Sequence, residues 1–84
     1  NIKNLKNLRN FCKTRGFKIF LANNLRLARS LYFDGVYLPS FNNERVLKEN
    51  LKKNFIILGS AHNIKEIKIK QRQFVDYIFV SPLF

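Results

Sequence analysis

Four short apolar runs recur along this chain at intervals of roughly 20 residues, and amphipathic stretches separate them. They are FKIFLA (residues 17–22), GVYL (35–38), FIILG (55–59) and DYIFV (76–80). Strands that are nearly continuous in apolar residues are buried on both faces, as in a parallel sheet covered by helices. Alternation of strand and helix at this spacing is the βαβ pattern, so the sequence predicts an α/β fold of parallel βα repeats.

The stretches between these runs carry helix signals. Apolar residues at helical spacing begin at Ile2, and Gly16 supplies a stop, so a helix should precede the first run. Asparagines, which cap helices well, stand where three further helices should begin: Asn23 or Asn24, Asn42 or Asn43, and Asn63. The last signal is the strongest, because Glu66 follows Asn63 at the spacing of a capping box.

The ends of the four runs define a candidate site. In parallel α/β folds, ligands bind where the carboxyl ends of the strands meet, and backbone N–H groups at helix starts favour phosphate there. The residues that follow the runs should therefore share one rim: Asn23, Asn24, Pro39, Ser40, Asn42, Ser60, His62, Ser81 and Pro82. By contrast, Asp34 and Asp76 lie at strand starts and are interpreted as structural.

The chain holds about half of the strands of a closed barrel. A (β/α)8 TIM barrel has eight strands and takes about 250 residues, whereas this sequence has 84. A free four-stranded sheet would also leave two open edges. We therefore interpret residues 1–84 as a single partial domain, the middle of an incomplete (β/α)8 barrel whose other half is missing. A small open sheet, or a homo-oligomer that completes the barrel, is the alternative.

The net charge restricts the partners. The chain carries a formal charge of +11, from 16 Lys and Arg against 5 Asp and Glu, which attracts nucleic acid, anionic lipid and phosphorylated metabolites. The basic residues are spread along the chain, without a glycine-rich phosphate loop, zinc-ligand spacing or RNA-binding signature. This pattern favours a solvated basic surface, and a basic nucleic-acid-binding module is the alternative.

Two features bear on the cellular location. No apolar run approaches the roughly 20 residues that span a bilayer, so no membrane partner is expected. The single cysteine, Cys12, cannot form an internal disulfide, which fits a reducing compartment, and it should be a small packed residue. The sequence therefore predicts a cytoplasmic protein.

Three of the strand ends resemble the thiamine phosphate synthase and TenI-type thiazole tautomerase superfamily. GVYLPSFN (35–42) is similar to a family segment that reads Gly-Val-His-Leu-Gly-Gln with an acidic residue shortly after it. LGSAHNIKE (58–66) resembles a Gly-x-Ser-x-His segment that leads into a helix, and DYIFVSPLF (76–84) resembles Asp-Tyr, an apolar strand, then Gly-Pro and an aromatic residue. The resemblance implies the (β/α)8 fold and a site for phosphorylated thiazole and pyrimidine compounds.

The resemblance implies one of two activities. The synthase branch joins a pyrimidine methyl pyrophosphate to a thiazole phosphate, and Mg²⁺ neutralises the departing pyrophosphate. The family's metal-holding carboxylates match Asn23 and Asn42, whose amide oxygens can ligate Mg²⁺ but lack the charge that makes such sites tight. The tautomerase branch shifts a thiazole double bond without a metal, and its proton-carrying histidine matches His62.

The resemblance and the rim together give the remaining candidates. Ser60 matches a serine of both branches, Ser81 stands where the family has a glycine, and Ser40 and Asn24 are further substrate-binding candidates. For His62, the alternative is a histidine that only forms hydrogen bonds at a helix start. Because the family's pyrophosphate-gripping and thiazole-phosphate segments do not occur in these 84 residues, we expect this span alone to be inactive. A non-catalytic relative that binds a phosphorylated ligand is a further alternative.

Overall fold

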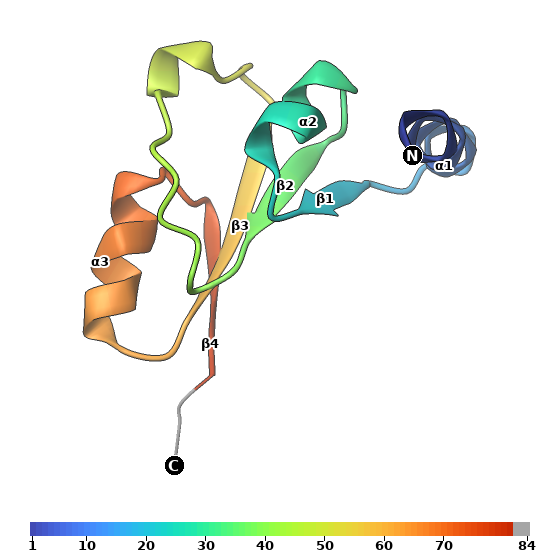
Figure 1. Ribbon diagram of the computed structural model, residues 1–84. Coiled ribbons are helices and arrows are strands. Elements are labelled where there is room, and N and C mark those ends of the chain that lie inside the picture. Colours follow the sequence, from blue (N-terminus) through green and yellow to red (C-terminus); the bar gives the residue numbers. More distant parts are fainter. Residues whose placement is uncertain (82–84) are drawn as a thin grey trace.

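Four parallel strands form one sheet in the computed structural model, which describes residues 1–81 (Figure 1). The strands lie in the order β1-β2-β3-β4, and every neighbouring pair is parallel. The elements are α1 (Ile2–Thr14), β1 (Phe20–Ala22), α2 (Leu25–Ser30), β2 (Gly35–Leu38), the 3₁₀ turn η1 (Lys48–Asn50), β3 (Ile56–Ala61), α3 (Ile64–Arg72) and β4 (Tyr77–Val80). The predicted α/β fold of parallel βα repeats is confirmed, and the arrangement is that of part of a TIM barrel.

The two faces of the sheet differ in burial. On the face that α2 and α3 cover, Val36, Leu38 and Ile57 are fully buried and form the core with apolar residues of α2. On the other face, Tyr37 and Leu58 are register partners and are only half-buried. All four residues of β4, one of the two edge strands of the sheet, are exposed. The expectation that the strands are buried on both faces is therefore wrong for the described residues, because only one face has helices packed on it.

Helix α1 is set apart from the sheet (Figure 1). The Asn1 side chain caps its start, and the helix ends before Gly16, whose φ of 76° lies in the left-handed region that glycine adopts readily. It has no buried residue, although the Arg9 Nη1 donates a hydrogen bond of 2.6 Å to the Leu31 carbonyl at the end of α2. Within residues 1–81, α1 is the longest helix, and none is long and apolar enough to cross a bilayer.

The same kind of aspartate hydrogen bond fixes the starts of two strands, β2 and β4. The Asp34 carboxylate accepts a hydrogen bond of 2.7 Å from the Ile19 backbone N–H, which lies just before β1. The Asp76 carboxylate accepts one of 2.8 Å from the Ile57 N–H in β3. Each aspartate thus ties the start of its own strand to the preceding strand, which agrees with the structural role predicted for both.

The helix expected after Asn42 or Asn43 does not form. Residues 42–47 have no regular secondary structure, and only the short turn η1 follows them. The cause is competition for backbone acceptors. Lys70 Nζ donates to the Asn42 carbonyl (2.7 Å) and Gln73 Nε2 to the Glu44 carbonyl (2.9 Å), so side chains from α3 occupy oxygens that a helix would use.

Candidate functional site

The predicted rim is one edge of the sheet. In Figure 1 the strands β2, β3 and β4 run downward, and the segments that follow them lie at the lower end of the sheet. Asn23 follows β1, Ser40 lies just beyond β2, His62 directly follows β3 and Ser81 follows β4. The backbone hydrogen bonds between neighbouring strands extend to the first residue after β1 and after β4. Asn23 N–H donates to the Tyr37 carbonyl at 2.7 Å, and Ser81 N–H donates to the Ala61 carbonyl at 3.1 Å.

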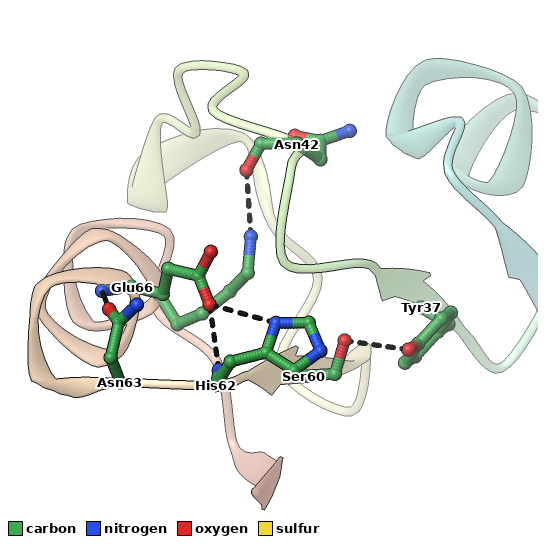
Figure 2. Close-up of polar contacts among 7 residues, drawn as sticks. Tyr37, Asn42, Ser60, His62, Asn63 and Glu66 are labelled. Carbon is green, nitrogen blue, oxygen red and sulfur yellow. Dashed lines mark hydrogen bonds and ion pairs between the residues drawn. The ribbon is translucent and has the colours of Figure 1, made fainter. Parts of the chain in front are cut away.

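His62 has a carboxylate partner. Its ring Nδ1 lies 3.1 Å from Oε1 of Glu66, and its backbone N–H donates to the same oxygen at 2.7 Å (Figure 2). Asn63 caps α3 by accepting a hydrogen bond of 2.9 Å from the Glu66 N–H. The predicted helix start is therefore confirmed, but the Glu66 carboxylate holds His62 rather than the N–H of the capping residue.

The charge state of Glu66 determines which nitrogen of a neutral His62 ring carries the proton. The hydrogen bond from the His62 backbone N–H lowers the pKa of Glu66 below its ordinary 4.5, against a smaller effect of desolvation, and the His62 ring and Lys70 lower it further. Glu66 is therefore ionised at neutral pH and can only accept hydrogen bonds. The proton of a neutral His62 ring must then lie on Nδ1, which leaves the lone pair of Nε2 available as a base.

Ser60 and Tyr37 form a second polar pair on the uncovered face of the sheet. The Tyr37 hydroxyl and Ser60 Oγ are 2.7 Å apart. Figure 2 shows the His62 ring with Nδ1 turned to Glu66 and its other nitrogen on the side of Ser60 in that view. With the Tyr37 hydroxyl as donor, the Ser60 hydroxyl remains free to donate to a ligand. The hydroxyl of Tyr37 thus has a hydrogen-bond partner, and its ring is half-buried.

The two candidate metal ligands lie against each other. Asn42 Nδ2 donates a hydrogen bond of 2.7 Å to Asn23 Oδ1, which joins the segments after β1 and β2. Asn23 has a φ of 61°, a left-handed conformation that asparagine tolerates better than most residues. The Asn42 Oδ1 also accepts from Gln73 Nε2 (3.0 Å) and from the Glu44 N–H (2.9 Å). The side-chain oxygens of both asparagines are therefore already engaged.

This donor set does not fit Mg²⁺. The ion prefers carboxylate oxygens in near-octahedral geometry, and here two neutral amides meet through an N–H group. Across residues 1–81, no group of three or more His, Cys, Asp or Glu side chains could hold a metal ion. The hydrogen bond between the two amides links the segments that follow β1 and β2 directly.

Of the other three predicted substrate contacts, one caps a helix and two lie in segments that follow strands. The Asn24 side chain accepts a hydrogen bond of 3.0 Å from the Leu27 N–H and caps α2, so its oxygen is occupied. Ser40 is half-buried in the segment after β2, and Ser81 is exposed. Pro82 lies outside the described residues.

Two buried polar residues, Lys70 and Gln73, were not predicted from the sequence, although both bind the Asn42 carbonyl at this rim. Lys70 is fully buried, and its Nζ donates to the Asn42 carbonyl and to Gln73 Oε1, both at 2.7 Å. Burial lowers the pKa of Lys70, against the opposing charge of Glu66. Gly59 leaves room for this side chain, because a Cβ there would lie 3.0 Å from the Lys70 Cδ.

Two signals in the sequence could have found these residues. Glu66 stands four residues after His62, the spacing at which side chains meet on a helix surface. Lys70 follows Ile67 by three residues, on the stripe that faces the sheet, where a lysine needs acceptors.

Comparison with known proteins identifies relatives of the whole arrangement. The family model described as "Thiamine monophosphate synthase" matches residues 2–84. A protein of Aquifex aeolicus (strain VF5) named "Putative thiamine-phosphate synthase 2" is 32% identical over 73 residues. That match covers 84% of this chain and 39% of the relative, so the chain spans about two-fifths of the length of this curated relative.

Proposed function

This chain belongs to the thiamine monophosphate synthase family, and we propose that its rim performs proton transfer on a phosphorylated thiazole, as in the tautomerase branch. The contact between His62 and Glu66 carries the proposal. A double-bond shift needs removal of a proton from one position and addition of a proton at another, and one acid–base side chain can do both. His62 has its Nδ1 held by an ionised carboxylate and its Nε2 free for this task.

In the proposed reaction, each residue of the rim has a defined part. Nε2 of His62 takes a proton from a carbon of the thiazole, and the Glu66 carboxylate stabilises the imidazolium that forms. The same nitrogen then returns the proton at the other end of the shifted double bond. The Ser60 hydroxyl, whose oxygen accepts from Tyr37, binds a polar atom of the substrate and orients the ring.

The first test is isomerisation in the presence of a chelator. Because the relative is longer than this chain, the assay uses the full-length protein that carries these residues. We expect the thiazole phosphate to isomerise at the same rate in EDTA and in excess Mg²⁺, followed by NMR of the thiazole protons. A rate that depends on Mg²⁺ would contradict the proposal. Binding of the thiazole phosphate without turnover would instead support a non-catalytic relative.

Synthase-type coupling is the second candidate, and the descriptions of the matching family and of the Aquifex protein favour it. It requires neutralisation of a departing pyrophosphate, which this rim would have to achieve with two amides in place of carboxylates. We therefore expect coupling to be absent or slow unless carboxylates are restored at Asn23 and Asn42.

The double variant Asn23→Asp/Asn42→Asp tests this expectation. Aspartate also tolerates the left-handed conformation of position 23, and two carboxylates in place of the paired amides should repel each other. We expect the melting temperature of the variant to fall in EDTA and to recover in millimolar Mg²⁺, while the parent protein shows no response to Mg²⁺. The matched control is Asn43→Asp, an exposed neighbour. If Mg²⁺ raised the melting temperature of the parent protein as much as that of the variant, the amides would hold the ion. Synthase-type coupling would then be the better candidate function.

A further inference from the structure

A cavity opens at the end of the sheet opposite the rim. It has a volume of about 520 Å³, which lies in the range of small-molecule sites. Its walls come from the end of α1, from α2 and from the segments that lead into β2 and β3. None of the rim residues lines it. A ligand bound there would occupy a site separate from that of the proposed proton transfer.

The cavity is lined by more positive than negative charge. Four basic residues line it, against the single carboxylate of Asp34: Lys13, Arg26, Arg29 and Lys52. That carboxylate already accepts the hydrogen bond from the Ile19 N–H. In the part of the chain that the structure describes, none of the four cations forms an ion pair. Arg26 and Arg29 lie three residues apart on α2, so their guanidinium groups can approach one anion from the same helix face.

Aromatic rings complete the wall. Tyr32 follows α2 and is 60% exposed, and the Lys52 Nζ lies 4.0 Å from the centroid of its ring. Phe33, which is buried, and Phe55, which is half-buried just before β3, are the other two aromatic residues at the cavity. Ser30, Asn50 and Asn54 add uncharged hydrogen-bonding groups. Cations that bind phosphate next to rings that stack on a planar base are the two elements of nucleotide recognition.

We propose that this cavity binds a nucleoside phosphate. The phosphates lie against Arg26 and Arg29, with Lys13 at the end of α1 adding charge. The base packs on the ring of Tyr32. The site is independent of His62 and of the chemistry at the rim, and it lies in a part of the chain for which no function was predicted from the sequence.

The experiment is calorimetric titration of the full-length protein with ADP, with inorganic pyrophosphate and adenosine as the two partial probes. ADP should bind more tightly than either. Arg26→Gln and Arg29→Gln should each weaken ADP binding by about tenfold, since each removes one charge-assisted contact. Tyr32→Leu should weaken the binding of ADP and leave that of pyrophosphate unchanged. His62→Ala should leave ADP binding unchanged.

The matched control for charge is Arg72→Gln, an exposed arginine at the end of α3 outside the cavity. It should change ADP affinity less than twofold, and the circular dichroism of every variant should match that of the parent protein. Two outcomes would overturn the proposal. One is equal weakening by Arg72→Gln, which would mean that ADP responds only to net charge. The other is pyrophosphate binding as tight as that of ADP, which would mean that no base is recognised.

Discussion

Replacing His62 with alanine should slow isomerisation of the thiazole phosphate by about 100- to 10,000-fold, the usual contribution of a general acid–base group. Affinity for the thiazole phosphate should stay within about twofold, because the imidazole acts on a proton and not on the phosphate. Single-turnover kinetics and calorimetric binding on the full-length protein separate the two effects. Turnover that is unchanged in the alanine variant would eliminate the proposed reaction.

The companion variant Glu66→Gln separates a catalytic His62 from one that only supports a helix start. The amide oxygen of glutamine can still accept the His62 backbone N–H, so the start of α3 should persist. The lost charge no longer stabilises the imidazolium that forms during the reaction, so the rate of isomerisation should fall. Lys70, the other charged neighbour of Glu66, is unchanged in this variant.

The ¹⁵N chemical shifts of the His62 ring report the same change directly. In the parent protein they should show the proton on Nδ1, and in Glu66→Gln a mixture of the two tautomers. A tautomer and an isomerisation rate that are both unaltered by the glutamine would contradict the positioning role of Glu66. Loss of helix signal in the circular dichroism would instead mean that the carboxylate serves α3 alone.

The sequence predicted the elements of this fold where the signal was local. The run GVYL coincides with β2 (Gly35–Leu38), and the Asn63 cap with Glu66 starts α3. Both follow from short-range patterns of burial and capping. The single rim also followed, because parallel strands have their carboxyl ends on the same side.

The errors lie where distant side chains decide the structure. No helix forms after Asn42, because its carbonyl oxygen accepts hydrogen bonds from the side chains of Lys70 and Gln73, which lie 28 and 31 residues away in the sequence. Local periodicity cannot reveal which backbone oxygen a buried lysine reaches. The link between Asn23 and Asn42 spans 19 residues and also depends on the tertiary fold. The resemblance placed these two amides at one site, but only the structure shows that they bind each other.

Replacing the buried Lys70 with alanine should lower the free energy of unfolding by about 3 kcal/mol. Two losses add to this value. The aliphatic stem that fills the space above Gly59 disappears, and Gln73 Oε1 loses its donor. The alanine variant no longer has to bury the Lys70 ammonium group away from water, and this gain offsets part of the loss in stability. Urea unfolding of the full-length protein gives the measurement, and hydrogen exchange should show faster opening of residues 42–47.

Two further variants separate the parts of this effect. Lys70→Met keeps the stem and removes only the donor, so it should cost about 1 kcal/mol, because the Asn42 carbonyl still accepts from Gln73 Nε2. Lys68→Ala removes an exposed lysine from the same helix and should change stability by less than about 0.5 kcal/mol. If Lys70→Ala lowered the free energy of unfolding no more than Lys68→Ala does, the contact between Lys70 and the Asn42 carbonyl would contribute nothing to stability.

The pH dependence of stability gives an independent test of the same residue. Burial holds the pKa of Lys70 below its ordinary 10.5, so the unfolded chain binds this proton more tightly than the folded chain. The contribution of Lys70 to stability should therefore be least favourable at low pH and should rise as the pH passes through the lowered pKa toward 10.5. Lys70→Met lacks this contribution, so the stability difference between the parent protein and the variant should grow in favour of the parent as the pH is raised. A difference that stays constant, or that shrinks, would mean that the lysine keeps its ordinary proton affinity beneath α3.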